Sequence, residues 1–170
     1  PPLAKEAFRK AARIAHEAGR QVSLTLSDAF CVDRFRAEFL GLLRDGTVDV
    51  LFANRTELLS LYETSSLEAA ISAVQDDCGL SAVTDSANGS YVVTRESVEL
   101  VPATPVDTVV DTTGAGDLYA SGFLLGYARG LPLGTCASLG SLAAAEVISH
   151  IGPRPGTNLL DLARSSGFAI

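Results

Sequence analysis

One short stretch, Asp111-Thr112-Thr113-Gly114-Ala115-Gly116-Asp117, constrains what this chain can fold into. An apolar run at 106–110 leads into it and an apolar helical stretch at 118–128 leads away, which predicts strand, tight turn and helix. Glycines at such a junction let the backbone approach a ligand closely, because they have no Cβ. The first turn of the helix leaves N–H groups unpaired at the positive end of its dipole. The stretch therefore predicts an anion site, with Asp117 placed to accept a proton.

The same glycine turn has simpler explanations. Asp117 could serve only to complement the helix dipole, and short glycine motifs often occur without a ligand. Two common phosphate motifs are excluded. A P-loop requires Lys and then Ser or Thr after its last glycine, where Asp117 and Leu118 stand. A dinucleotide fingerprint requires a small residue at the position of Tyr119, which argues against a dinucleotide-dependent oxidoreductase.

The order of the predicted elements indicates an α/β fold with a largely parallel sheet. Helical spacing predicts helices at 3–18, 32–43, 55–62, 66–77, 115–129, 133–149 and 159–165. Short β-like runs predict strands at 21–26, 48–53, 80–84, 90–94, 98–102 and 106–110. Asn88-Gly89, between two of these runs, indicates a hairpin.

Composition narrows the function classes. The chain has 170 residues, enough for one domain, and 13 basic against 20 acidic residues give a net charge of −7, which argues against a nucleic-acid surface. No apolar run reaches the length of a membrane span. Three widely spaced cysteines, Cys31, Cys78 and Cys136, suggest free thiols in a reducing cytoplasm. Because the chain contains no Met, we expect it to be a piece of a longer protein.

The whole stretch from Asp111 to Asp117, continued by Leu118-Tyr119-Ala120-Ser121-Gly122-Phe123, resembles the C-terminal signature of the ribokinase-like (PfkB-type) sugar and nucleoside kinases. The resemblance implies a three-layer α/β/α fold, with residues 1–170 as the C-terminal, nucleotide-binding half of one domain. It implies that Asp117 is the catalytic base of an ATP-dependent phosphotransferase. The amides of Gly114, Ala115 and Gly116 would form the anion hole, with Thr112 and Thr113 beside the nucleotide. Asp111 would be available to a K⁺ ion.

Asn54 and Glu57 follow a predicted strand and open a helix, which is the pattern of a capping box. The same Asn-x-x-Glu spacing is similar to a second motif of the family. There the pair helps to hold Mg²⁺ with the phosphates, largely through water, and Mg²⁺ does prefer oxygen ligands and retained waters. The capping and metal-linked roles are compatible.

Two further segments resemble family elements that border the nucleotide. Thr84, Ser86 and Gly89 correspond to a loop beside the phosphates and ribose, but Asp85 and Asn88 depart from the usual residues there. A carboxylate near triphosphate would repel it, so either Asp85 points away or ATP binding is weakened. The stretch 143–155, with Ala144 and Gly152, resembles the wall of the adenine site. Its small residues would equally allow close helix packing.

The segment 24–35 and the His-Ile-Gly-x-Arg-Pro ending are most similar to bacterial adenosine-kinase-like members. The resemblance implies a cytoplasmic enzyme that uses ATP and Mg²⁺ on a small sugar or nucleoside, with no nucleic-acid or membrane partner. It also implies that the N-terminal half with its lid is absent, so these residues alone would be inactive, and that the full-length protein could form a homodimer. A catalytically inactive nucleotide-binding or regulatory module is the alternative.

Overall fold

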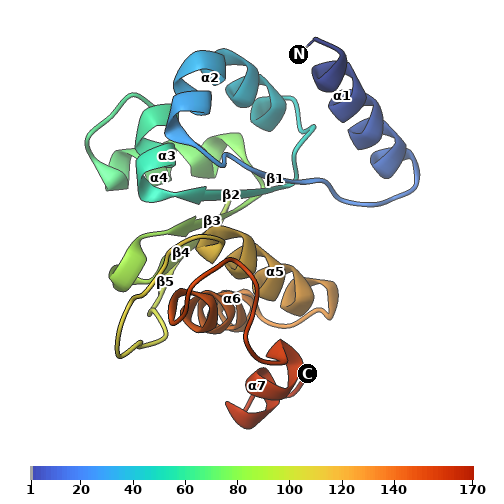
Figure 1. Cartoon of the computed structure of the whole chain (residues 1–170). Helices are drawn as coiled ribbons and strands as arrows, with labels where there is room; N and C mark the ends of the chain where they lie inside the picture. The colour runs from blue at the N-terminus through green and yellow to red at the C-terminus, as the bar shows by residue number, and fades with distance from the viewer. Residues whose placement is uncertain (1) are drawn as a thin grey trace. The chain divides into compact units, whose positions relative to one another are not determined.

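The computed structural model describes residues 2–170 and confirms the α/β class (Figure 1). Its strands are β1 (Ser23–Thr25), β2 (Val50–Asn54), β3 (Leu80–Thr84), β4 (Ser90–Thr94) and β5 (Val98–Val101). Its helices are α1 (Pro2–Glu17), α2 (Ala29–Arg44), α3 (Arg55–Leu61), α4 (Leu67–Asp77), α5 (Ala115–Ala128), α6 (Leu133–Ile148) and α7 (Leu159–Ser165), with a 3-10 turn at Ser86–Asn88. Among the described residues, no helix is long and apolar enough to cross a membrane.

The strands form one five-stranded sheet in the order β1-β2-β3-β4-β5. β1 and β2 are parallel, with Leu24 opposite Leu51. The connections from β3 to β4 and from β4 to β5 are far shorter than the dozen or more residues that a parallel crossover needs. The sheet is therefore mixed, with hairpins in its second half, and the predicted hairpin at Asn88-Gly89 is confirmed.

Contacts divide the chain into two compact units. Unit 1 comprises Pro1–Val83 and Val93–Val98, and unit 2 comprises Thr84–Val92 and Glu99–Ile170. In unit 1, α3 packs on β2 and on the neighbouring helices α2 and α4. The apolar residues of β2 and the inward faces of α3 and α4 are buried, as for Leu51, Leu58 and Val74. This core places the start of α3 at the carboxyl end of β2.

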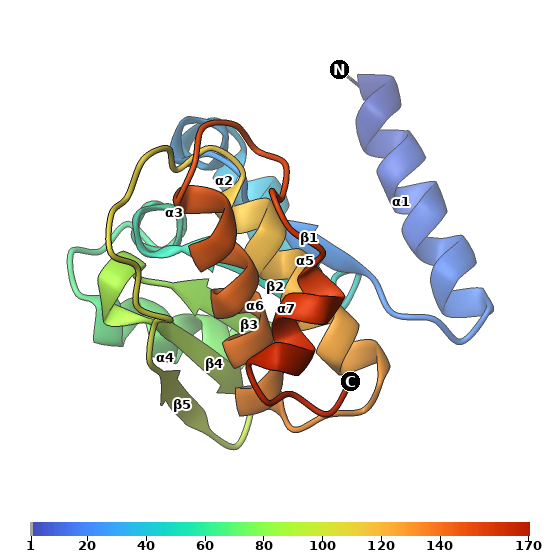
Figure 2. The same ribbon diagram turned by 60° about the horizontal axis from the view of Figure 1, so that its bottom comes forward.

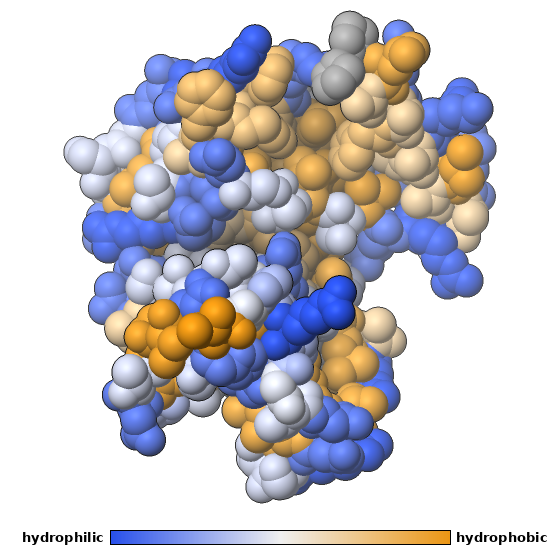
Figure 3. Space-filling model, viewed as in Figure 1, coloured by the Kyte–Doolittle hydropathy of each residue, from blue (hydrophilic) through white to orange (hydrophobic). Residues whose placement is uncertain are grey.

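An apolar groove of about 260 Å³ lies between α1 and α2 in unit 1. Figure 3 shows its hydrophobic surface between the two helices, and Phe8, Phe35 and Phe39 contribute to its lining. α2 is kinked at Phe35, whose backbone is not helical. Leu3 and Ile14 on α1 are 78% and 53% exposed. Part of the apolar surface of α1 is therefore in contact with solvent.

Unit 2 is built on the close packing of α5 against α6, which lie side by side in both ribbon views (Figures 1 and 2). Gly122 and Gly140 allow this approach. A Cβ on Gly122 would lie 2.5 Å from the Leu139 carbonyl oxygen, and one on Gly140 would lie 2.6 Å from that of Tyr119. The buried Tyr119 hydroxyl lies 2.7 Å from the Ser90 hydroxyl, which fixes the start of α5 against β4.

The predicted strand at 106–110 is wrong, because this segment has no regular secondary structure. The Val110 N–H donates to the Ile148 carbonyl at the end of α6 (2.8 Å). Val109 and Val110 are about half exposed, so the apolar run is not a buried strand. The remaining predicted elements are present. Several have ends that differ by a few residues, as at β1, where only Ser23–Thr25 of 21–26 is a strand.

Candidate functional site

The loop 111–117 ends at the first turn of α5, as the sequence predicts. Gly114 is the N-cap residue and has a left-handed backbone (φ +83°), a conformation that strongly favours glycine. The Leu118 N–H donates to the Gly114 carbonyl (2.9 Å), which begins the helical hydrogen bonding. Asp117 lies in this first turn with its side chain exposed. A carboxylate that reaches solvent is therefore placed at the positive end of the α5 dipole.

The Asp111 carboxylate stabilises this loop through hydrogen bonds. Its Oδ1 accepts hydrogen bonds from the Thr113 hydroxyl (2.7 Å) and N–H (2.9 Å), and its Oδ2 accepts one from the Gly152 N–H (2.9 Å). These bonds, led by that of the Thr113 hydroxyl, lower the pKa of Asp111 to about 2. Asp111 is therefore charged at neutral pH and joins the loop to the segment that follows α6.

The two glycines of the loop differ in their surroundings. A Cβ on Gly114 would lie 2.9 Å from the Cβ of Pro153, which is closer than real Cβ atoms approach. A Cβ on Gly116 would meet nothing within 4 Å. Gly114 is therefore required by the fold, whereas Gly116 presents an open backbone on which a ligand could lie.

The predicted anion hole of three amides stays a prediction, and one of the three amides already has a hydrogen-bond partner within the loop. The Ala115 N–H donates to the Thr112 carbonyl (3.2 Å) and so closes the turn. The side chain and N–H of Thr113 are bonded to Asp111. Gly114, Gly116 and the first turn of α5 remain as the donors that an anion at this position would use.

The segment from Thr84 to Gly89 forms a compact turn between β3 and β4. Ser86 and Gly89 have positive φ angles of 51° and 100°. Asp85 is only 8% exposed, and its carboxylate accepts a hydrogen bond from the Asn88 side-chain amide (3.1 Å). The two residues that depart from the family pattern therefore contact each other. Because of this bond, at least one carboxylate oxygen of Asp85 points into the turn.

Ala144 and Gly152 belong to α6 and to the segment after it. Ala144 is half-buried, between the buried Ala143 and Ala145. Gly152 has φ +97° and donates its N–H to Asp111. The structure thus brings Gly152 together with the loop 111–117.

Asn54 and Glu57 form the predicted capping box at the start of α3 in unit 1. The Asn54 side-chain oxygen accepts the Glu57 N–H (2.9 Å), and the Glu57 carboxylate accepts the Asn54 N–H (2.9 Å) and side-chain amide (2.8 Å). Burial raises the pKa of Glu57, and the nearby Asp28 adds to this effect, while the Asn54 N–H opposes it. The cap is confirmed, and the metal-linked role stays a prediction.

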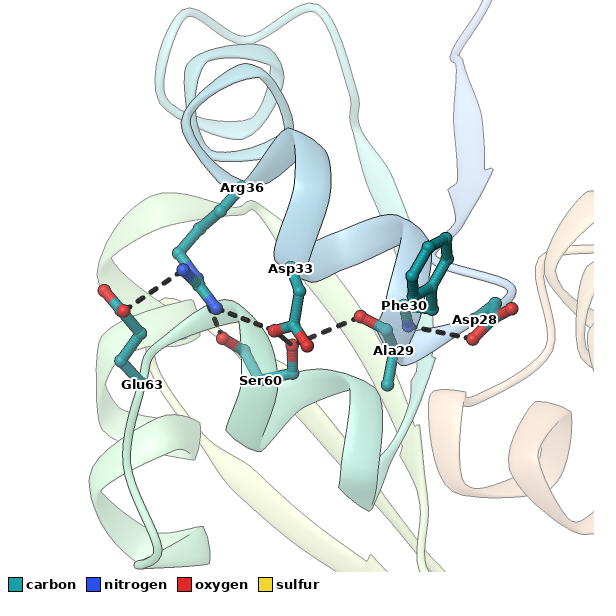
Figure 4. Close-up of polar contacts among 7 residues, drawn as sticks. All are labelled: Asp28, Ala29, Phe30, Asp33, Arg36, Ser60 and Glu63. Atoms are coloured by element: carbon teal, nitrogen blue, oxygen red, sulfur yellow. Dashed lines mark hydrogen bonds and ion pairs between the residues drawn. The ribbon is translucent and has the colours of Figure 1, made fainter.

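A polar network holds α3 against α2 and so supports this cap (Figure 4). The Arg36 guanidinium contacts the Ser60 carbonyl (3.0 Å), Asp33 (2.8 Å) and Glu63 (3.1 Å). The Ser60 hydroxyl donates to the same Asp33 carboxylate (2.6 Å). Because Arg36 is only a quarter exposed, these bonds are partly shielded from water. They fix the rotation of α3.

Among residues 2–170, no group of three or more His, Cys, Asp or Glu side chains is arranged to hold a metal ion. A dense cage is not what Mg²⁺ requires in a phosphate site, because it keeps several waters and binds through one or two carboxylates and the phosphates themselves. Asn54 and Glu57 supply oxygen atoms of the right chemistry, with Glu57 held in one orientation by the cap.

One residue of unit 2 was missed by the sequence reasoning. Glu146 on α6 holds the segment that follows the helix, through bonds to Gly156 and Thr157. Its signal in the sequence is a single charged residue inside the apolar run Ala143-Ala144-Ala145-Glu146-Val147. Such a side chain needs a specific partner if its helix face is buried.

Comparison with known proteins identifies similar sequences and structures. A model of the pfkB family carbohydrate kinases matches residues 1–158. The crystal structure of an adenosine kinase from Sinorhizobium meliloti is 54% identical, with a TM-score of 0.95 over 96% of this chain and 50% of that one. A probable sugar kinase from Rhizobium etli gives the same values.

Curated relatives are more distant in sequence. An uncharacterized sugar kinase from Archaeoglobus fulgidus is 34% identical over 108 residues, which cover 63% of this chain and 42% of the relative. The adenosine kinase of Saccharomyces cerevisiae is 27% identical over 163 residues, which cover 89% of this chain and 47% of the enzyme. The chain thus spans about half the length of these relatives.

Proposed function

This chain belongs to the pfkB family of carbohydrate kinases, and we propose on that premise that the protein containing it phosphorylates a small sugar or nucleoside. The reaction moves the γ-phosphoryl group of ATP to a primary hydroxyl of the acceptor. Adenosine is the first acceptor to test, because the similar structure from Sinorhizobium meliloti is that of an adenosine kinase. The observation that carries this proposal is the exposed Asp117 at the start of α5, beside the open backbone of Gly116.

In this mechanism Asp117 acts as the general base. Its carboxylate takes the proton of the acceptor hydroxyl as that oxygen bonds to the γ-phosphorus and the bond to the β-phosphate oxygen breaks, leaving ADP. The backbone of Gly114 and Gly116 and the first turn of α5 stabilise the charge on the transferring group. Ala115 contributes through the turn that it closes with Thr112.

Asn54 and Glu57 would hold Mg²⁺ through bound waters, because both Glu57 oxygens already accept hydrogen bonds from Asn54. When bound, Mg²⁺ would neutralise phosphate charge. Thr84, Ser86 and Gly89 would border the phosphates and ribose, with Thr112 and Thr113 beside them. Ala144 and Gly152 would border the adenine. Asp111 would also be available to K⁺, and activity indifferent to replacement of K⁺ by a large organic cation would remove that role.

The alternative is a nucleotide-binding or regulatory module without catalysis, which Asp85 would favour if its charge faced the nucleotide. The hydrogen bond between Asp85 and Asn88 instead supports ATP binding, because it draws the carboxylate into the turn. Calorimetry separates the two functions. Binding of ATP–Mg²⁺ by the full-length protein without turnover of any acceptor would establish the alternative.

Residues 1–170 alone are proposed to be inactive. The chain spans about half of its relatives, and phosphoryl transfer depends on positioning the acceptor and excluding water. We propose that the rest of the polypeptide supplies the acceptor platform and the lid, that the full-length protein works in the cytoplasm, and that it could dimerise. Assays of the full-length protein with ATP, against nucleosides and sugars in turn, test the reaction class. Absence of phosphorylation of every acceptor would contradict it.

A further inference from the structure

Glu146 is a buried carboxylate whose hydrogen bonds reach forward along the chain. Its side chain is 9% exposed, and Oε1 accepts hydrogen bonds from the N–H groups of Gly156 (2.8 Å) and Thr157 (3.0 Å), with the Thr157 hydroxyl at 3.4 Å. A buried charge is costly unless its partners compensate it. This charge therefore restricts the segment after α6, residues 149–157, which we name the closing segment.

The other end of the closing segment contacts the candidate site. The Gly152 N–H donates to Asp111, and Pro153 packs on the position where Gly114 has no side chain. Gly114 is the N-cap of α5, and Asp117 lies in the first turn that it begins. Glu146 and Asp111 thus hold the closing segment on either side of Pro153, and Pro153 contacts the backbone that positions Asp117.

His150 completes the local arrangement. Its Nε2 lies 3.5 Å from Glu146 Oε1, which is within ion-pair distance, but the two atoms form no hydrogen bond. Its Nδ1 lies 3.4 Å from the Ile151 carbonyl oxygen. The firm bonds of the Glu146 carboxylate are therefore those to the backbone of the closing segment, and they do not need a charged histidine.

We propose that Glu146 is a positioning residue for phosphoryl transfer, acting through the closing segment on Gly114 and the first turn of α5. This inference rests on the proposed kinase function. Loss of the carboxylate releases Gly156 and Thr157, loosens Pro153 from Gly114 and lets the anion site shift. A displacement of about 1 Å at a reacting group can cost about 100-fold in rate. The effect is therefore on kcat, whereas a purely structural role would lower only stability.

The test uses three variants of the full-length protein, assayed with ATP and its best acceptor well below the unfolding temperature. Glu146→Ala should lower kcat by about 10- to 100-fold, with a smaller change in the acceptor KM. Glu146→Gln keeps an oxygen that can accept the Gly156 and Thr157 N–H groups, so it should restore kcat to within a few-fold of wild type. Glu99→Ala is the matched control. It removes an exposed carboxylate that lies against Gly134, at the opposite end of α6, and should leave kcat unchanged.

Amide hydrogen exchange of the same proteins without substrate gives a readout that does not depend on activity. Glu146→Ala should speed exchange at Gly156 and Thr157 and also at Gly152, whereas Glu146→Gln and Glu99→Ala should not. Faster exchange at Gly152 in Glu146→Ala would show that Glu146 restrains the end of the closing segment that contacts the candidate site. This result would support the inference even if no acceptor is phosphorylated, and only the proposed kinase reaction would then be contradicted. An active wild type with unchanged kcat in Glu146→Ala, or unchanged exchange at Gly152, would overturn the inference.

Discussion

The Asp111 carboxylate accepts a hydrogen bond at 2.9 Å from the N–H of Gly152, which lies 41 residues further along the chain. The same carboxylate binds the N–H and hydroxyl of Thr113. One side chain thus joins the loop that begins α5 to the segment that follows α6. The geometry of the candidate anion site depends on this link. The ionisation of the Asp111 carboxylate provides a test of its contribution to stability.

Stability should depend on the charge of Asp111 at low pH. Its folded-state pKa is lowered to about 2, while an unfolded Asp has a pKa of about 3.9, so the folded protein binds this proton more weakly. The stabilisation is present above the unfolded pKa and is lost as the pH falls through the folded one. Asp111→Asn cannot accept the Gly152 N–H through its NH₂ group and should unfold at a lower temperature at pH 7.

The measurement is thermal unfolding of wild type and Asp111→Asn between pH 7 and pH 2. The difference in unfolding temperature should be constant above about pH 5 and shrink between about pH 4 and pH 2. A difference that stays the same across this range would show that the charge of Asp111 does not contribute.

The two loop glycines should respond differently to alanine. Gly114→Ala places a Cβ 2.9 Å from that of Pro153 at a positive φ, so it should destabilise by at least about 1 kcal/mol. Gly116→Ala meets nothing within 4 Å and should leave stability unchanged or slightly raised. Its methyl group would stand on the open backbone proposed to face the phosphate, so it should lower kcat/KM by about tenfold or more.

Denaturant unfolding and kinetics of the two variants separate fold from function. We expect Gly116→Ala to be stable but to have reduced activity, and we expect Gly114→Ala to be less stable than wild type. Full activity in Gly116→Ala would show that the phosphoryl group does not approach this side of the backbone.

The capping and metal-linked roles of Asn54 can also be separated. Asn54→Ala removes the oxygen that accepts the Glu57 N–H and should cost about 1 kcal/mol. Asn54→Ser keeps an oxygen that can accept the Glu57 N–H and adds no charge beside Glu57, so its stability should fall less than that of Asn54→Ala. If the pair also serves Mg²⁺, both variants should change the Mg²⁺ concentration that gives half-maximal activity. An unchanged Mg²⁺ requirement in both would leave only the cap.

Much of the fold could be predicted from local patterns. The ends of α7, β3 and β4 coincide with the predicted ranges, because turn residues and changes in periodicity mark them clearly. The capping box of Asn54 and Glu57 could be predicted because its two partners are three residues apart. Such features depend on near neighbours in the sequence.

The features that could not be predicted depend on contacts between residues that are distant in the sequence. The run 106–110 has the composition of a strand, but Val110 donates to Ile148 at the end of α6, so no strand forms. The site residues Asp111 and Gly152 were identified from family resemblance, yet their hydrogen bond was not. The role of Glu146 depends on contacts ten and eleven residues ahead, beyond any helical period, and therefore required the structure.

Residues 1–170 expressed alone should be poorly soluble. β1 is the last strand on one side of the sheet, and Leu3, Ile14 and Phe30 are more than half exposed in unit 1. Exposed apolar surface beside the open outer edge of a strand favours association. Size-exclusion chromatography should show aggregates, and co-expression with the remaining half of the full-length protein should yield a soluble complex. A soluble monomer of 1–170 that phosphorylates adenosine would contradict this prediction.

Asp117 is proposed to be the base of the phosphoryl transfer, and the kcat of Asp117→Asn in the full-length protein tests this role. Asp161→Asn is the matched control, because Asp161 is also an exposed aspartate in the first turn of a unit 2 helix, α7. We expect Asp117→Asn to lower kcat by about 10²- to 10⁴-fold while ATP–Mg²⁺ still binds, and we expect Asp161→Asn to keep the kcat of wild type. Turnover by Asp117→Asn at a rate near that of wild type would contradict this role.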